Sequence, residues 1–457
     1  MRILLLLATT ILFSVNVFGQ KEAPFSEVKE LPSQFFPGEA RSVSVQLPKG
    51  YSADRKYPVI YTLDGQSLFP MVSDYVKHLG NETDEDGYDL GTNSIPASIV
   101  VGVHHTNRGE ETEPNFEGVG YLPGPQKLYD FLTRELVPYV DSTYSTSGYD
   151  VIIGHSNTAQ FVTNSILMEE VVFDGVIALS LVEGSSGFKG SLENRLKVMG
   201  ERSYFLGYGF KDNEFNYLAK ELSGKLEGDG VRISGYNANH GDLPVVSLLD
   251  GLKFTFRHYR NFDNFISASR SVDFSVAQYV DDYGQSMKSN YGVLAEINEE
   301  DYGYLIVESV DNKDIDLFNE LIKYDEQKND FEYQEIVLFH YRKELGDLDG
   351  AKSLAYRMLS SDEKMTGRFL LGQLDAFVDF FAKDLAAPLE AIDFLEKIAK
   401  KFPDSRLTTS YFIATTSSAY KVELEKGKTS LKYCAEHYEE NRFFDEKDLD
   451  KLEKEGA

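Results

Sequence analysis

The sequence predicts an α/β domain, in which a mostly parallel sheet is covered by helices on both faces, followed by an all-α region. Two observations support this fold class. Between about residues 40 and 258, short apolar runs typical of buried strands alternate with longer stretches of helical periodicity, which indicates parallel strands joined by crossover helices. Beyond about residue 265, glycine becomes rarer and one helical pattern follows another.

Composition excludes several classes of function. The chain has 457 residues and a formal net charge of −28. A charge this negative repels phosphate groups, so binding to nucleic acid or to an anionic membrane surface is not expected. The hydrophobic share of 42% is ordinary for a folded protein. Because Cys434 is the single cysteine, an internal disulfide and a cysteine-rich zinc module are both excluded.

Residues 1–20 are typical of a secretory signal peptide. Arg2 precedes an apolar run over residues 3–13, and the small residue Gly19 follows. The run is shorter than the roughly 20 apolar residues that a membrane span needs. We therefore expect cleavage near Gly19 or Gln20, export to the periplasm or the medium, and a mature protein without a membrane span.

The strands and helices of the first domain, which we expect to cover residues 21–264, follow in a regular order. Segment 41–47 alternates polar and apolar residues, as a half-buried strand does, whereas 57–63 and 98–103 suit strands buried on both faces. Further strands are expected at 149–154, 172–179, 203–207 and 232–236. Helices are expected at 128–139, 158–168 and 243–256.

The second region, residues 265–457, is expected to be all-helical. Its helical patterns lie at 314–324, 332–345, 348–359, 369–381, 389–401 and 408–421. Helix pairs of this size suggest a small solenoid, and segment 391–403 looks like the second helix and terminating proline of a tetratricopeptide-type unit. The charged end, 445–457, is expected to be frayed.

Ser156 is the candidate nucleophile. It lies between the strand that ends at Gly154 and a helical stretch that starts near Thr158. A strand–turn–helix that carries G-x-S can hold the serine in a strained conformation and lift its hydroxyl above the sheet edge. The motif G-x-S-x-G is one member short, because Thr158 replaces the second glycine. By spacing alone, G-x-S also fits an ordinary surface or N-cap serine.

Among the eight histidines, His240 is the candidate base. It lies in a short polar loop between the last expected strand and a helix, so it can fold back over the carboxyl edge of the sheet. The alternative is a loop histidine exposed to water. His155 lies beside the serine, but its side chain is expected to point away around the turn.

The carboxylate that orients the base is expected between the serine and the histidine in chain order. Asp212 and Glu214 both follow the strand at 203–207 and precede a helix. Asp212 is preferred because it is closer to the strand end, and Glu214 is the alternative. Alone, either acid could instead be a helix N-cap or first-turn residue.

Ester chemistry also requires donors for the developing oxyanion. The backbone N–H of Asn157, directly after the nucleophile, is one expected donor. The other should come from the loop after the strand at 57–63, where the N–H of Gly65 or Gln66 is a candidate. An Asp-Gly turn such as this one is also common without any function.

An ordered series of motifs resembles the esterase D / enterochelin-esterase-like branch of the α/β-hydrolases. The likeness covers about residues 36–258, at 45–51 (VQLPKGY), 56–65 (KYPVIYTLDG), 100–103 (VVGV), 106–108 (TNR), 113–114 (EP), 131–139 (FLTRELVPY), 154–156 (GHS) and 240–244 (HGDLP). The resemblance implies an α/β-hydrolase fold and a Ser–acid–His ester hydrolase that needs no cofactor. It also implies a substrate among carbohydrate acyl esters, siderophore lactones and thioesters, and some relatives carry a C-terminal helical repeat module.

Two departures from the family pattern motivate an alternative. Small residues usually stand where this chain has Thr158, and a serine–proline pair is common where it has Ser180-Leu181. The leading hypothesis is an exported serine esterase acting on a small-molecule or carbohydrate-linked ester. The alternative is a catalytically weak or inactive hydrolase fold used for binding. In either case the C-terminal helices could dock a protein partner or mediate self-association.

Overall fold

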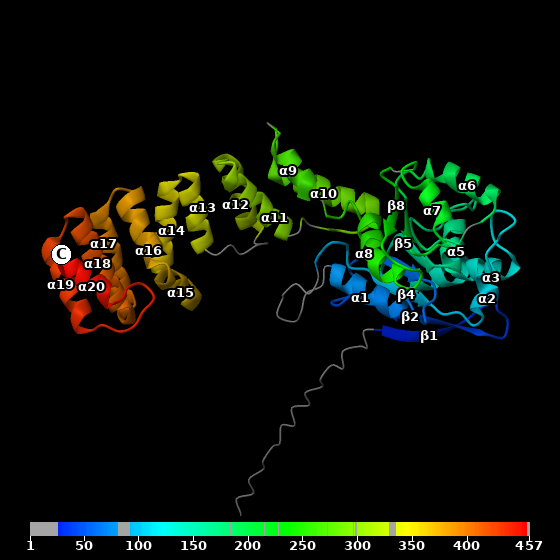
Figure 1. Cartoon of the computed structure of the whole chain (residues 1–457), viewed down its shortest axis with the longest axis horizontal. Helices are drawn as coiled ribbons and strands as arrows, with labels where there is room; N and C mark the ends of the chain where they lie inside the picture. Colours follow the sequence, from blue (N-terminus) through cyan, green and yellow to red (C-terminus); the bar gives the residue numbers. More distant parts are fainter. Residues whose placement is uncertain are drawn as a thin grey trace, which may run out of the picture. The chain divides into compact units, whose positions relative to one another are not determined.

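The structure is a computed structural model of the whole chain (Figure 1). The residues that it describes are 26–80, 92–182, 184–213, 215–226, 228–260, 262–271, 273–295, 297, 299–328 and 335–454. The expected signal peptide and the alternative acid Glu214 therefore lie outside the described residues.

Within the described residues, eight strands form one sheet in the order β1-β2-β4-β3-β5-β6-β7-β8. Strands β1 and β4 pair antiparallel with β2, and all other neighbours pair parallel. The strands are β1 (Ser26–Pro32), β2 (Ala40–Gln46), β3 (Tyr57–Thr62), β4 (Ile99–Val103), β5 (Thr146–His155), β6 (Gly175–Leu179), β7 (Ser203–Gly209) and β8 (Val231–Tyr236). This sheet, covered by helices, confirms the predicted α/β-hydrolase fold class.

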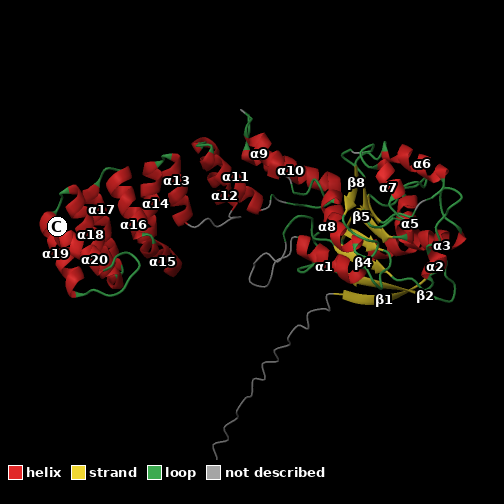
Figure 2. Cartoon of the chain, in the orientation of Figure 1, coloured by secondary structure: helices red, strands yellow, loops and turns green. Residues whose placement is uncertain are grey.

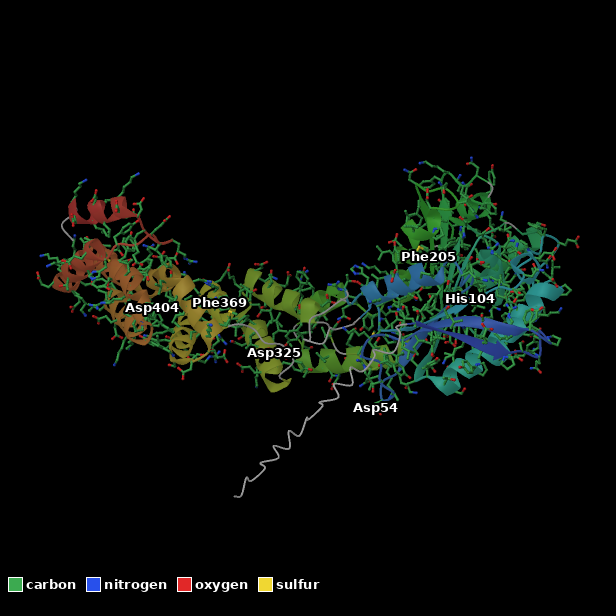
Figure 3. All side chains as sticks on the ribbon, turned by 90° about the horizontal axis from the view of Figure 1, so that it is seen from below. Asp54, His104, Phe205, Asp325, Phe369 and Asp404 are labelled. Atoms are coloured by element: carbon green, nitrogen blue, oxygen red, sulfur yellow. The ribbon has the colours of Figure 1, made fainter. Side chains whose placement is uncertain are left out.

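Helices lie on both sides of the sheet (Figure 2). On one side, α1 and α8 contact each other and pack on β4 and β7, and on the other, residues of α3 to α7 share one hydrophobic core with the strands. Phe205 of β7 is fully buried in this unit (Figure 3). The helices are α1 (Phe69–Leu79), α2 (Arg108–Glu111), α3 (Pro123–Phe131), η1 (Leu132–Leu136), α4 (Val137–Thr143), α5 (Asn157–Ser165), α6 (Ser186–Leu196), α7 (Tyr217–Leu222) and α8 (Leu243–Thr255).

The sheet unit differs from the sequence prediction in several places: helices α1, α2, α6 and α7 were not predicted, and two further differences have a clear physical cause. Strand β1 was not predicted, because its alternating residues are at best half-buried and carry little apolar signal. The helix predicted over 128–139 is α3 and α4 joined by the π-helical turn η1. This wide turn ends just before Pro138, which has no N–H to continue the α-helical bonding.

The C-terminal region is all-helical within its described residues, as predicted. Its helices are α11 (Glu299–Asp311), α12 (Ile315–Lys328), α13 (Glu335–Leu345), α14 (Leu348–Ser360), α15 (Lys364–Gly372), α16 (Leu374–Asp379), η2 (Phe380–Asp384), α17 (Pro388–Lys401), η3 (Pro403–Ser405), α18 (Arg406–Tyr420), α19 (Leu424–Glu436) and α20 (Glu446–Lys454). Consecutive helices contact each other, as in the pairs α13–α14 and α18–α19. The tetratricopeptide likeness stays a prediction.

Two predictions in the helical region were wrong. The helix expected over 369–381 is divided at Gln373, whose φ of −133° lies outside the helical range. The chain end is helical rather than frayed up to Lys454, because Leu449 and Leu452 of α20 are buried in a local core. Two leucines three positions apart give even a highly charged helix one apolar stripe.

The chain divides into two compact units. The first contains the described residues of Met1–Phe265 and Gln278–Asn298, and the second those of Ile266–Ala277 and Glu299–Ala457. Helices α9 (Phe262–Ser269) and α10 (Val276–Tyr291) contribute residues to both units. Among the described residues, no helix combines the length and apolar character required to cross a lipid bilayer.

Candidate active site

Ser156 stands at a strained turn between β5 and α5. Its φ and ψ are 64° and −124°, a conformation that L-residues rarely adopt and that costs about 1–3 kcal/mol. Backbone hydrogen bonds hold it there, because the Ser156 N–H donates to the Leu179 carbonyl at 2.9 Å. A Cβ at Gly154 would lie 2.2 Å from the Thr158 carbonyl oxygen, so this position requires glycine. The elbow expected from G-x-S is therefore present.

Asp212 and His240 are brought together, as their order in the chain predicted. The His240 Nδ1 lies 2.9 Å from Asp212 Oδ2, and the Asp212 side chain is 5% exposed. An ionised carboxylate only accepts hydrogen bonds, so Nδ1 carries the proton and Nε2 is left as an acceptor. This tautomer is the one that a general base requires.

Ser180 is a member of the site that sequence reasoning missed. Its buried hydroxyl donates to the same Asp212 Oδ2 at 2.6 Å, and its φ is +53°. The N–H of Ser180 donates to the Gly207 carbonyl. A serine directly after β6, at the carboxyl edge of the sheet, was the available signal. Leu181, which stands where proline is common in the family, leaves this hydroxyl in place.

The His240 ring contacts two other rings. Its centroid is 4.5 Å from that of His155 and 4.4 Å from that of Phe215. His155 Nε2 also lies 2.9 Å from the His240 carbonyl oxygen. The His155 side chain, which was expected to point away around the turn, packs on the ring of the candidate base. Burial, and then the neighbouring His240, lower the pKa of His155 to about 4, so the neutral ring donates its Nε2–H to the carbonyl.

Ser156 is adjacent to this group but not bonded to it. Among the described residues, no hydrogen bond joins the Ser156 hydroxyl to the His240 imidazole. The two residues are linked through His155, which follows Gly154 on β5 and contacts His240 by ring and hydrogen bond. Hydrogen bonds between nucleophile and base are often long in a free enzyme and tighten when substrate binds.

One of the two candidates for the second oxyanion donor is excluded. The N–H of Gly65 donates to the Val103 carbonyl at 2.8 Å, so it is not available. Gly65 packs so tightly on β4 that a Cβ there would lie 2.7 Å from the His104 ring. Within the described part of the chain, the N–H of Gln66 makes no hydrogen bond, nor does that of Asn157, the first residue of α5. These two N–H groups remain the candidate donors.

A buried ionic network holds the loops around the site. Arg41, 1% exposed, binds both carboxylate oxygens of Glu111 at 2.9 and 2.8 Å. Burial alone would raise the pKa of Glu111, but hydrogen bonds from His105 and Arg41 hold it well below its usual range. The His105 Nδ1 contacts Glu111 at 2.8 Å, and its Nε2 accepts from the Asp64 N–H at 3.3 Å.

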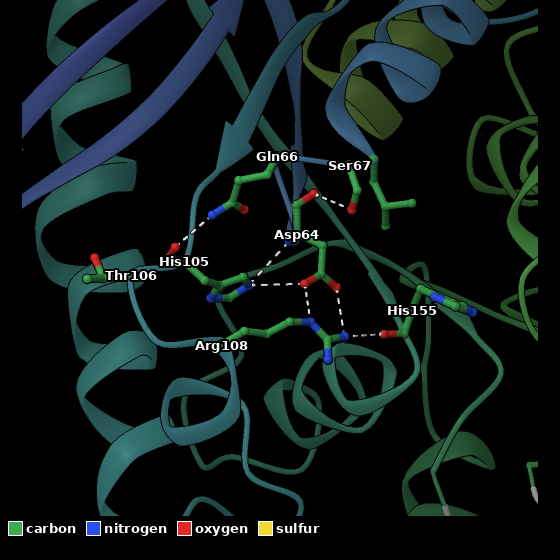
Figure 4. A pocket seen from close by; sticks show the side chains of 8 residues that line it. Asp64, Gln66, Ser67, His105, Thr106, Arg108 and His155 are labelled. Carbon is green, nitrogen blue, oxygen red and sulfur yellow. Dashed lines mark hydrogen bonds and ion pairs between the residues drawn. The ribbon is translucent and has the colours of Figure 1, made fainter.

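Asp64 is the centre of this network next to the elbow (Figure 4). Its carboxylate accepts from Arg108 Nε at 2.5 Å and Nη2 at 3.1 Å, and from the Thr158 hydroxyl at 2.9 Å. Arg108 Nη2 also donates to the His155 carbonyl at 3.3 Å. A pocket of roughly 480 Å³ opens beside these groups and is lined by Asp64, Gln66, Ser67, Leu68, His105, Thr106, Arg108 and His155.

The described side chains around Ser156 are not arranged as a metal site. Among the described residues, no group of three His, Cys, Asp or Glu side chains is arranged to hold a metal ion. The acidic and histidine side chains near Ser156 are instead paired with each other, with arginine or with hydroxyls.

Comparison with known proteins points to one family. A family model described as "Putative esterase" matches residues 34–206, which include the β3 loop and the elbow. This match confirms the resemblance found in the sequence and supports the prediction that the chain is a carboxylic ester hydrolase. No curated protein matches the chain.

Several solved structures are similar to this chain. An uncharacterised protein from Capnocytophaga ochracea is similar over 82% of this chain and 93% of its own, with 14% identity and a TM-score of 0.51. An IroE-like serine hydrolase from Shewanella oneidensis is similar over 65% of this chain and 98% of its own, with 22% identity and a TM-score of 0.48. A siderophore hydrolase from Aspergillus nidulans is similar over 51% of this chain and 95% of its own, with 12% identity and a TM-score of 0.41.

Proposed function

We propose that this chain, whose residues 34–206 match the esterase family, is an exported serine esterase with Ser156 as nucleophile. The observation that carries the proposal is the hydrogen bond of 2.9 Å between Asp212 and His240, made next to a strained elbow serine. A serine on a strand–helix turn, a histidine and a carboxylate that follow in this chain order are the parts of a hydrolase triad.

In the acylation step, the His240 Nε2 removes the proton from the Ser156 hydroxyl as its oxygen attacks the ester carbonyl carbon. Asp212 holds the imidazole in the tautomer with the proton on Nδ1 and stabilises the imidazolium that forms. The imidazolium then gives its proton to the leaving alcohol, which leaves an acyl group on Ser156.

The oxyanion of the tetrahedral intermediate is proposed to bind the N–H groups of Asn157 and Gln66. Donors fixed in advance at such a position are each worth about 3–4 kcal/mol, because they stabilise charge that exists only in the transition state. Water activated by His240 then releases the acyl group and restores Ser156. The reaction needs no electron transfer and no cofactor.

The test is hydrolysis of short-chain aryl esters by the purified mature protein and by Ser156→Ala. Loss of the nucleophile should lower kcat by roughly 10⁴-fold or more. Ser360→Ala, which removes an exposed hydroxyl at the end of α14, is the matched control and should be fully active. Equal rates for wild type and Ser156→Ala would refute the nucleophile assignment.

The alternative function, a binding protein built on an inactive hydrolase fold, gives the opposite result with a covalent probe. A fluorophosphonate that labels wild type but not Ser156→Ala supports the esterase. Absence of labelling in both supports the binding protein, whose partner would then be sought on the C-terminal helices. Self-association through those helices is tested separately by light scattering of the full mature chain.

Export and substrate class need their own measurements. Mass spectrometry of the protein secreted from its host should give a mature chain that begins near residue 20, and an intact residue 1 would contradict export. The proposed substrates are small-molecule or carbohydrate-linked esters, and parallel assays with aryl carbohydrate esters, a siderophore trilactone and a thioester would separate these classes.

A further inference from the structure

We propose that Thr158 fastens the two halves of the oxyanion hole to each other through the hydrogen bond from its hydroxyl to Asp64. Thr158 stands where the esterase family usually has a small residue, and by sequence alone it counted against activity. The structure gives it a positioning function instead. The inference rests on the proposed function, because the hole matters for rate only if Ser156 attacks an acyl carbon.

The Thr158 hydroxyl makes contacts on both sides of the elbow. Its oxygen accepts from the His155 N–H at 2.7 Å and lies 2.9 Å from Asp64 Oδ2 and 2.8 Å from the His155 carbonyl. The hydroxyl has one proton to donate. The carboxylate is the stronger acceptor, because hydrogen bonds to an ionised group are about twice as strong as neutral ones. The His155 carbonyl already accepts from Arg108.

Asp64 transmits this contact to the other half of the hole. The Asp64 backbone has a left-handed conformation, with φ of +55°, in the turn that carries Gln66. The turn closes through the Asp64 carbonyl, which accepts from the N–H of Ser67 and of Leu68 at 2.8 and 2.9 Å. A shift of the Asp64 side chain would therefore move the backbone at Gln66, which offers the second donor.

Few other bonds join the two halves. The last bond of the sheet between them runs from the Leu63 N–H to the Ile153 carbonyl at 3.0 Å. Beyond it, the described residues connect the halves through side chains, namely Thr158 to Asp64 and Arg108 to both Asp64 and the His155 carbonyl. The Arg108 side chain is 42% exposed, whereas Thr158 is fully buried. The Thr158 bond is consequently less weakened by water.

The matched variants differ in one hydroxyl. Thr158→Val keeps the shape of the side chain and removes the hydroxyl, both as donor to Asp64 and as acceptor of the His155 N–H, whereas Thr158→Ser keeps the hydroxyl and removes a methyl group. Thr163→Val is the control, because Thr163 is equally buried on the same helix and its hydroxyl bonds to the Ala159 carbonyl and Tyr204 rather than to the site. Each protein is first checked for its thermal midpoint and circular dichroism.

The expected result is a loss of kcat without a change in KM. Small displacements of groups that stabilise a transition state can cost up to about 10²-fold, so Thr158→Val should lose about tenfold or more in kcat on an aryl ester, with KM within about twofold. Thr158→Ser should recover most of the rate. An aryl trifluoromethyl ketone, whose adduct with Ser156 carries the oxyanion, should bind Thr158→Val more weakly by a similar factor.

Each other outcome is decisive. A folded Thr158→Val with kcat within twofold of wild type refutes the inference, and so does an equal loss in Thr163→Val. If Thr158→Val does not fold, Thr158→Ala removes the same hydroxyl from a smaller side chain and is compared with Thr158→Ser in the same way. A wild type that is no faster than Ser156→Ala refutes the proposed function itself, which is a different result.

Discussion

Buried carboxyl groups at the two ends of the parallel sheet differ in how many hydrogen-bond donors they have. At the carboxyl end, Asp64 and Asp212 each accept from two other side chains. At the opposite end, Asp150 is 5% exposed and its Oδ1 has no hydrogen-bond partner among the described residues. The two carboxylates at the edge where chemistry is proposed thus have side-chain donors, whereas Asp150 Oδ1 at the other end has none among the described residues.

This difference shows what the carboxyl edge requires. A buried carboxylate with enough donors can stay ionised and hold a neighbouring group in one orientation. A buried carboxylate without donors is protonated instead, and burial, followed by the charges of Asp141 and Asp174, raises the pKa of Asp150 to about 8. Removing the charge of Asp212 at the carboxyl end of the sheet should therefore abolish function. Removing the carboxyl group of Asp150 at the opposite end should stabilise the fold.

The largest expected effect is that of Asp212→Asn. An amide would leave the His240 Nδ1 without its acceptor and favour the wrong tautomer, so kcat should fall by about 10⁴-fold, as in other triads. Activity on an aryl ester across pH 6–9 is the measurement. Glu214→Gln, at the alternative acid, is measured in parallel. A larger loss in Glu214→Gln than in Asp212→Asn would transfer the acid's role to Glu214.

Asp150→Asn is expected to raise the free energy of unfolding at neutral and alkaline pH but not at acidic pH. The pKa of Asp150 is raised in the folded chain from 3.8 to about 8, so the stabilisation from the protonated native form is complete below about pH 4 and is lost as pH rises through about 8. Asparagine carries no charge at any pH and avoids this loss. We expect a gain of roughly 1–3 kcal/mol at pH 8, since each pKa unit corresponds to about 1.4 kcal/mol and buried sites relax.

The free energy of unfolding in urea, measured at pH 4 and pH 8 for wild type and Asp150→Asn, tests this expectation. The difference between the two proteins should be larger at pH 8 than at pH 4. A difference that does not depend on pH would mean that the Asp150 carboxyl titrates normally and that the two ends of the sheet do not differ as inferred.

Ser180→Ala should have a smaller effect on the rate. Its hydroxyl is one of two donors to Asp212 Oδ2, and a hydrogen bond to a charged group contributes about 1.5–3 kcal/mol. Because His240 remains as the other donor, we expect kcat to fall by about tenfold, with KM unchanged. Ser203→Ala, which removes a buried hydroxyl at the first residue of β7, is the control and should keep full activity.

Sequence patterns predicted the sheet and the convergence of its loops, because these follow from hydrophobic periodicity and chain order. The carboxyl ends of parallel strands share one edge, so the turn at Ser156 and the loops carrying Asp212 and His240 were expected to meet there. The Asp212–His240 bond is present, while the catalytic roles stay predictions. Contacts set by side-chain direction were beyond sequence reasoning, as with the Ser180 hydroxyl.

The loss of Gly65 as an oxyanion donor has the same origin. Whether its N–H is free depends on the loop meeting β4 closely enough to bond Val103, and no spacing in the sequence encodes that approach. The same holds for Thr158, which the sequence presents as a missing glycine and the structure as a hydroxyl bonded to Asp64. Most of the strands, and the sheet edge at which their loops meet, were therefore predictable from the sequence, but the partners of individual polar groups were not.

The smallest expected effect is that of His155→Phe. Because its pKa is near 4, His155 is neutral at working pH and contributes no charge to the site. Phenylalanine keeps a ring against His240 and removes the hydrogen bond to the His240 carbonyl. A neutral hydrogen bond is worth about 0.5–1.5 kcal/mol, so kcat should fall by about threefold. The loss in kcat should be constant from pH 6 to pH 9. A loss that grows below pH 7 would show that His155 becomes charged in this range, which would contradict its neutral state at the carboxyl end of the sheet.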